Sequence, residues 1–175
     1  MGEGLRVVLA LMLAAVVTTI GASASGWWLE PRRRVIRALR RSLGAREDAA
    51  AVSPERRQGL ATSAANQAVC VIRFAGDPGL VRPLATVHGA ELILDGEVKA
   101  RAFRGEARRP LDRILAPEGG RVSLRVVFDD FADPAFQIDL FRPGDRPRQL
   151  FGAAEAVEDA RAVYGRLEAA IQAPR

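Results

Sequence analysis

Few side chains in this sequence are of the types that catalyse reactions or bind metals, and the densest group of them is acidic. Asp129, Asp130 and Asp133 lie close together in the chain, and clustered carboxylates are what hard cations such as Ca²⁺ prefer. No glycine-centred calcium loop surrounds them, and no further acidic residue follows at a fixed spacing. We therefore interpret this stretch as a solvated turn between two strands and expect no metal site.

His88 and Cys70 are the only residues of their types, which limits the available chemistry. One cysteine cannot form a disulfide within the chain, and one cysteine with one histidine does not make the usual four-ligand zinc site. No nucleophile accompanies His88, and no glycine loop followed by lysine and serine could hold a phosphate. We expect no enzymatic activity, no cofactor and no small-molecule substrate, with Cys70 a small buried side chain on a strand.

The basic residues of the 175-residue chain are concentrated in one segment. The formal net charge is +5, and residues 29–59 alone hold nine arginines against four acidic residues, which is also +5. A nucleic-acid-binding domain more often carries its basic residues across a folded face. We therefore do not expect nucleic acid as a partner.

An uncharged apolar run, Val7 to Ala24, precedes this basic segment. As a helix it would span roughly 27 Å, close to the hydrocarbon thickness of a bilayer. Ala22 and Ala24 resemble a signal-peptidase site, so a cleaved export signal that releases a periplasmic domain is one interpretation. The arginines that follow the run favour the other, which is an uncleaved single-pass anchor in a bacterial inner membrane. Its N-terminus would lie outside and the remaining chain in the cytoplasm.

Two sets of candidate contact residues belong to this membrane interpretation. Small residues repeat every four positions along the anchor and predict close packing against a helix of a membrane-protein partner: Ala10, Ala14, Thr18 and Ala22. An amphipathic helix beginning at Pro31 is expected to rest on anionic lipid, with its arginines toward the phosphates, although the same arginines could serve only to set topology. The expected membrane-interface residues are Trp27, Trp28, Arg32, Arg33, Arg34, Arg37, Arg40 and Arg41.

A third candidate contact segment lies further along the chain, between Arg104 and Leu115. Arginines there alternate with aliphatic residues, so a short amphipathic turn could contact a partner protein. A solvated loop is the other interpretation. The residues are Arg108, Arg109, Leu111, Ile114 and Leu115.

From Gly59 onward the apolar residues follow the period of strands. Short strand candidates precede the turn residues Asp95 and Gly96, which are typical of a hairpin. The stretches RVSLRVVF and FQIDLF alternate apolar and other residues, and residues 153–173 then repeat apolar side chains at helical spacing.

The predicted fold class is α+β, in three parts. Residues 1–28 form a transmembrane helix, and residues 29–58 a basic juxtamembrane helix and linker. Residues 59–175 form a mainly antiparallel β-sheet or small barrel that a C-terminal amphipathic helix closes. Within residues 44–58 the helix could continue to about Val52, or the chain could form a tether.

Two quoted stretches, RPLATVHGAELILDGE and RVSLRVVFDDFADPAFQIDLF, resemble bacterial pleckstrin-homology-like (PH-like) domains. The resemblance covers roughly residues 59–171 and implies a PH-like β-domain, found in small bacterial membrane and phage-related proteins. The chain departs from that pattern at RGEARRPLDRILAPEGG, where such domains often carry a glycine-rich apolar insertion. The resemblance implies no particular functional residue.

These observations together predict a non-catalytic, membrane-anchored interaction protein. It would present its PH-like domain at the cytoplasmic face as an adaptor or as an accessory subunit of a larger membrane complex. The alternatives are a sensor of anionic lipid surfaces and a periplasmic domain released by signal-peptide cleavage.

Overall fold

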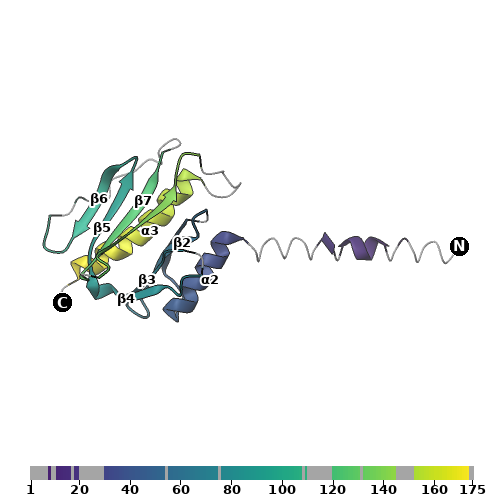
Figure 1. The fold of residues 1–175 in the computed structure, drawn as a ribbon, viewed down its shortest axis with the longest axis horizontal. Coiled ribbons are helices and arrows are strands. Elements are labelled where there is room, and N and C mark those ends of the chain that lie inside the picture. The colour runs from purple at the N-terminus through teal and green to yellow at the C-terminus, as the bar shows by residue number, and fades with distance from the viewer. Residues whose placement is uncertain are drawn as a thin grey trace.

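The computed structural model describes Val8 and residues 11–16, 18–19, 30–53, 55–74, 76–107, 109, 120–130, 132–144 and 152–173. Among the described residues from 30 onward, two four-stranded antiparallel sheets and two α-helices form one part of the structure (Figure 1). Helix α2 (Pro31–Leu43) comes first in this part, and helix α3 (Ala153–Gln172) comes last.

Sheet A has the strand order β1-β2-β3-β4, with every neighbouring pair antiparallel. Its strands are β1 (Ala49–Ser53), β2 (Gln58–Ser63), β3 (Ala68–Ile72) and β4 (Leu80–Pro83). All five residues of β3 are buried, which shows that both faces of this strand are covered. A short 3₁₀ helix, η1 (Leu84–Thr86), leads from β4 to the second sheet.

Sheet B has the order β6-β5-β7-β8 and is also antiparallel throughout. Its strands are β5 (Val87–Leu94), β6 (Glu97–Phe103), β7 (Val122–Phe128) and β8 (Ala135–Phe141). The β5–β6 hairpin turns at Asp95 and Gly96, whose φ angles of 52° and 83° are those of a type I′ turn. The hairpin prediction for this dipeptide is therefore confirmed.

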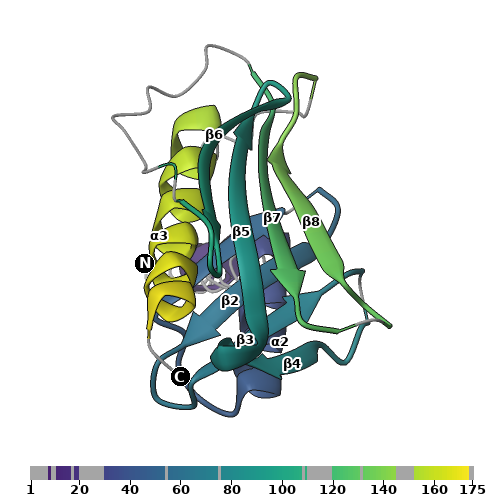
Figure 2. The ribbon, with the colours of Figure 1, turned by 90° about the vertical axis from the view of Figure 1, so that its left-hand side faces the viewer.

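The main core lies where the inner faces of both sheets meet α3. Figure 2 shows sheet B facing the viewer, sheet A crossing behind it and α3 along one side. The alternating residues of β7 and β8 point their apolar side chains into this core, as the sequence predicts: Val122, Leu124, Val126, Phe136, Ile138 and Leu140. The C-terminal helix buries the predicted apolar face, including Tyr164 and Leu167, both 0% exposed. The α+β class with a closing C-terminal helix is therefore the architecture observed.

The transmembrane part of the predicted fold class is wrong. Among the described residues, no helix is both long enough and apolar enough to cross a bilayer. Helix α2 has 13 residues, six of them arginines, and α3 is long enough but carries charged residues along its length. The same finding overturns the predicted location, which was a single-pass protein of a bacterial inner membrane with its N-terminus outside and a cytoplasmic domain. Of the predicted anchor, residues 1–7, 9–10, 17 and 20–28 lie outside the described residues.

The segment expected to be a linker also differs from the expectation. Residues 49–53 form β1, which pairs with β2 and places Ala51 opposite Leu60. Alanine is the best helix former and is depleted in strands, but burial in sheet A outweighs this preference here, since Ala51 and Val52 are both 0% exposed. Helix α2 accordingly ends at Leu43, where Gly44 adopts a left-handed conformation with φ of 65°.

Candidate binding groove beside helix α2

Helix α2 packs its apolar face on the outer face of sheet A. Val35, Leu39 and Leu43 are buried there, against a second apolar cluster formed by outward-facing residues of β1, β2 and β3. Gly59 permits this close approach, because a Cβ at that position would lie 2.6 Å from Val35 Cγ1 and 2.9 Å from Leu39 Cδ1. The face expected to rest on lipid is thus occupied by the protein's own sheet.

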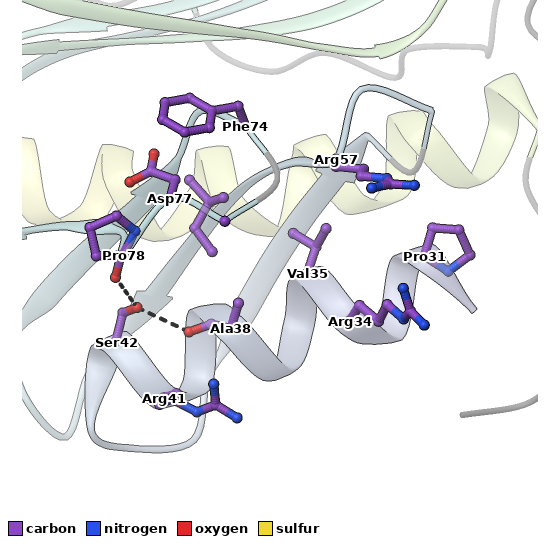
Figure 3. Close-up of a pocket in the computed structure, with 12 residues that line it drawn as sticks. Pro31, Arg34, Val35, Ala38, Arg41, Ser42, Arg57, Phe74, Asp77 and Pro78 are labelled. Carbon is purple, nitrogen blue, oxygen red and sulfur yellow. Dashed lines mark hydrogen bonds between the residues drawn. The ribbon is translucent and has the colours of Figure 1, made fainter. Parts of the chain in front are cut away.

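A groove with a volume of about 480 Å³ runs along one side of α2, between the helix and the loop that joins β3 to β4 (Figure 3). Apolar side chains line part of it, and polar and charged side chains line the rest. The lining residues are Pro31, Arg34, Val35, Ala38, Arg41, Ser42, Arg57, Ile72, Phe74, Gly76, Asp77 and Pro78.

The β3–β4 loop is held in place by one carboxylate. Asp77 accepts hydrogen bonds from the backbone amides of Arg73, at 2.7 Å, and Gly79, at 3.0 Å. The hydroxyl of Ser42 lies 2.6 Å from the Pro78 carbonyl oxygen and 3.0 Å from that of Ala38, and it ties this loop to the last turn of α2. One wall of the groove is therefore organised by local hydrogen bonds.

Gly79 also brings this loop close to the helix. Its φ is 83°, and a Cβ there would lie 2.7 Å from Ser42 Oγ and 3.1 Å from Cys70 Sγ. Cys70 is fully buried, as predicted for a small side chain on a strand. Burial raises the pKa of its thiol to about 11, with the charge of Asp77 adding to the rise and a hydrogen bond with Ser42 opposing it. The thiol therefore stays protonated at neutral pH and supplies no nucleophile to the groove.

Three arginines of the groove have no acidic partner. Arg34 and Arg41 on α2, and Arg57 in the β1–β2 turn, are exposed, and their side chains make no hydrogen bond or ion pair with another described residue. Arg46 and Arg166 are the other described arginines in this situation, and neither lines the groove. The lining holds three arginines and one aspartate, Asp77, so it carries an excess of two positive charges. The carboxylate oxygens of Asp77 accept hydrogen bonds from two backbone amides.

Arg57 holds an uncommon backbone conformation, with φ of 53°. The left-handed conformation costs a residue with a Cβ atom roughly 1–2 kcal/mol, and glycine would not bear this cost. Figure 3 shows Arg57 near the Pro31 end of α2, on the side of Arg34 and away from Arg41. Backbone strain of this kind is concentrated at binding sites.

An aromatic side chain stands beside the groove. Phe74 is 60% exposed, and it is the most exposed large hydrophobic side chain described after residue 16. An apolar floor of Val35, Ala38 and Ile72 with an aromatic edge and unpaired cations can bind a ligand that has both apolar and anionic groups.

The remaining arginines predicted for the membrane interface are engaged within the protein. Arg32 Nη2 lies 2.6 Å from Asp159 Oδ2 of α3, and Arg33 Nε lies 2.8 Å from Glu30 Oε2. Arg40 pairs with Glu47 at 2.5 Å, and Arg37 Nε donates to the Arg33 carbonyl oxygen at 3.3 Å. Trp27 and Trp28 lie outside the described residues.

The other two predicted contact sets are only partly described. Thr18 Oγ1 donates to the carbonyl oxygen of Ala14 at 2.8 Å, and both residues are exposed, whereas Ala10 and Ala22 lie outside the described residues. Arg109 pairs with Arg101 by backbone hydrogen bonds and donates from Nη1 to the Val98 carbonyl oxygen at 2.8 Å. Arg108, Leu111, Ile114 and Leu115 lie outside the described residues.

The acidic residues of the turn after β7 lie beside three different side chains. Asp129 lies 3.1 Å from Nδ1 of His88, Asp130 pairs with Arg82 and Asp133 pairs with Arg73. Within the described part of the chain, no group of three or more acidic, histidine or cysteine residues could hold a metal ion.

A second charged cluster lies on the outer face of sheet B. Asp139 accepts two hydrogen bonds from Arg121, at 3.0 and 2.8 Å, one from Ser123 at 2.6 Å and others from Arg142. Burial alone would raise the pKa of Asp139, but the donors from Arg121, Ser123 and Arg142 outweigh it and hold that pKa well below its usual range. This cluster joins β7 to β8.

Sequence reasoning missed most of the groove. It singled out Arg34 and Arg41 for another role, and it assigned no role to Arg57, Phe74 or Asp77. The groove is built from three segments far apart in the chain, and whether an arginine has an acidic partner depends on the tertiary fold.

In comparisons with known proteins, no family model, no curated protein and no solved structure matches this chain. The resemblance to PH-like domains therefore stays a prediction.

Proposed function

We propose that this chain is a non-catalytic interaction module whose groove beside α2 binds an acidic segment of a partner protein. The module would act as an adaptor or as an accessory subunit of a larger complex. The observation that carries the proposal is that Arg34, Arg41 and Arg57 line the groove without an acidic partner among the described residues.

Charge complementarity supports this choice of partner. Most described arginines have a carboxylate or a carbonyl oxygen within hydrogen-bonding distance of the side chain. The three groove arginines are an exception to this pattern. Carboxylates of a partner would supply charge-assisted hydrogen bonds to them. The apolar floor adds a contact for an aliphatic side chain of the same segment, which a purely anionic partner would leave unused.

The packing of α2 favours a protein partner over a lipid surface. A helix that binds a bilayer inserts its apolar face among the acyl chains. The apolar face of α2 is buried on sheet A through Val35, Leu39 and Leu43, and cannot insert while the domain is folded.

Binding of labelled peptides to the full chain tests the proposal. Two pools of fluorescein-labelled eight-residue peptides are compared by fluorescence anisotropy, one made from Glu, Leu, Ala and Gly and the other with Lys in place of Glu. We expect the acidic pool to bind and the basic pool not to bind.

A charge-matched pair of double variants identifies the site. Arg34→Gln with Arg41→Gln removes two groove cations, whereas Arg46→Gln with Arg166→Gln removes two unpaired cations elsewhere. We expect the groove pair to weaken binding about tenfold, a difference of about 1.4 kcal/mol, and the control pair to leave it unchanged. Equal losses in both pairs would show attraction by net charge alone and would refute the groove as the site.

A further inference from the structure

The backbone spacing of the two helical arginines can be compared with the spacing of acidic groups on a ligand. Arg34 and Arg41 are seven positions apart on α2, so they share one side of the helix, as seven residues are close to two turns. At 1.5 Å per residue their backbone positions are roughly 10.5 Å apart. Figure 3 shows both side chains along the same side of α2.

Among extended peptide conformations, polyproline II places two side chains on one face at close to that distance. A polyproline II segment has three residues per turn and rises about 3.1 Å per residue, so residues three apart share a face at about 9.3 Å. In a β-strand, residues three apart point to opposite faces. A helix is about 10–12 Å across with its side chains, so an extended segment can lie deeper between α2 and the β3–β4 loop than a helix can.

We infer that the groove takes an extended, polyproline II-like segment of a partner protein that carries two acidic residues three positions apart, one at Arg34 and one at Arg41. This inference rests on the proposed function and adds the spacing and conformation of the ligand. An aliphatic side chain between the two acids enters the floor formed by Val35, Ala38 and Ile72.

The other walls suit such a segment. The exposed ring of Phe74 offers a flat apolar surface, and aromatic-lined grooves are the usual docking sites for polyproline II peptides. Arg57 adds a third cation near the Arg34 end, so the acid bound there meets two guanidinium groups.

A series of peptides of constant composition tests the spacing. The probes are fluorescein-labelled GGELAEGG, GGEELAGG, GGELEAGG and EGGLAGGE, each with two glutamates and one leucine, in which the glutamates are three, one, two and seven positions apart. Anisotropy titrations use the full chain. We expect GGELAEGG to bind about tenfold more tightly than the other three and to lose this advantage on either Arg34→Gln or Arg41→Gln.

The outcomes separate the inference from the proposed function. If all four peptides bind equally and the groove variants still weaken them, the spacing is refuted and the proposed function stands. If none binds, and vesicles of phosphatidylglycerol bind instead with the same dependence on Arg34 and Arg41, both are refuted in favour of a lipid headgroup.

A variant in the floor provides a second readout that does not depend on removing a cation. Ala38→Glu places an acid between the two arginines, where it would compete with the peptide, and glutamate is a good helix former. Ala38 is half-buried against the apolar cluster under α2, so we expect a lowered unfolding midpoint in a variant that still folds, together with a loss of GGELAEGG binding of at least tenfold. Undiminished binding to this folded variant would refute the placement of the segment in the groove.

Discussion

Sheets A and B each turn one face toward the shared core, but their outer faces carry different residues and meet different surroundings. The outer face of sheet A includes Val52, Ala61, Cys70 and Ile72, all nearly inaccessible under α2. The outer face of sheet B has a row in which Glu91 faces Arg101 on one neighbouring strand and Arg125 on the other. No helix packs on that row among the described residues, and the arginines are about half exposed.

The difference shows how side-chain chemistry decides whether a sheet needs a second cover. Strands that are apolar on both faces have to be buried on both, because exposed apolar surface costs about 25 cal/mol for each Å². Strands that alternate apolar and charged residues can leave one face in water and hold it together by cross-strand pairs. Sheet A therefore depends on α2, and sheet B depends on its buried carboxylates.

The largest effect is expected from weakening the packing of α2 on the outer face of sheet A. Leu39 is fully buried between α2 and the sheet, so Leu39→Ala should lower the free energy of unfolding by about 2–5 kcal/mol. Urea unfolding measures the loss, and the rate at which Cys70 reacts with a thiol reagent reports whether the cover has loosened. An unreactive Cys70 with a loss below about 1 kcal/mol would mean that α2 is not what protects this face.

An intermediate effect is expected from sheet B. Asp139→Asn leaves Arg121 and Arg142 without their carboxylate and should cost about 1.5–3 kcal/mol at neutral pH. Glu91→Gln is the matched comparison. It should cost less, because the arginines lie 3.4 and 3.6 Å from Glu91. A larger loss for Glu91 than for Asp139 would contradict the importance of the shorter hydrogen bonds.

The lowered pKa of Asp139 gives this difference a pH dependence. Below about pH 4 the Asp139 carboxylate is protonated in the unfolded chain, whereas in the folded protein it stays ionised to lower pH. Stability from Asp139 is therefore fully present above that pH and is lost as the pH falls toward the folded-state pKa. Urea midpoints at pH 7, 5 and 3 should show the wild type approaching Asp139→Asn as the pH falls. A difference in urea midpoint that stays constant with pH would exclude the Asp139 carboxylate as the source of the pH dependence.

A smaller effect, of opposite sign, is expected at the groove beside α2. Arg57→Gly relieves a left-handed conformation that costs roughly 1–2 kcal/mol, and glycine's flexibility in the unfolded chain takes back about 0.5–1 kcal/mol. Urea unfolding should show stability unchanged or raised by up to about 1 kcal/mol, while binding of GGELAEGG weakens. A clear loss of stability would make Arg57 a structural residue of the β1–β2 turn.

The smallest effect is expected where α2 meets α3. Burial raises the pKa of Asp159 although Arg32 pairs with it, so the ionised form is disfavoured in the folded protein. The stability that protonated Asp159 contributes is present at low pH and is lost as the pH rises through the folded-state pKa of this residue. Asp159→Asn should therefore change the free energy of unfolding at pH 7 by no more than about 0.5 kcal/mol. Loss of more than about 2 kcal/mol in urea unfolding would show that the pair fastens α2 to α3.

Much of the folded architecture could be predicted from local patterns. The alternation in residues 122–128 and the helical repeat in residues 153–173 match β7 and α3 closely, because each pattern is a direct consequence of strand or helix geometry. Local patterns did not predict β1, because the three alanines of its sequence AAAVS favour a helix and burial in sheet A overrides that preference.

The groove could be predicted only in part, for a related reason. The sequence showed that α2 would be amphipathic and rich in arginine, and this was correct for residues 31–43. It did not show that Arg32 and Arg40 would find carboxylates while Arg34 and Arg41 would not, since Asp159 lies more than a hundred residues from Arg32 along the chain.

The sequence by itself determined that the chain has antiparallel strands, a closing C-terminal helix and an apolar stripe on α2 that must be buried. Tertiary structure alone decided what buries that stripe. The hydrophobic effect drives apolar surface out of water without specifying the partner surface, so a bilayer and a sheet satisfy the same sequence pattern equally well. The close approach at Gly59 allows sheet A to be that partner. The same docking, with the β3–β4 loop held against the last turn of α2, creates the groove and leaves its arginines unpaired.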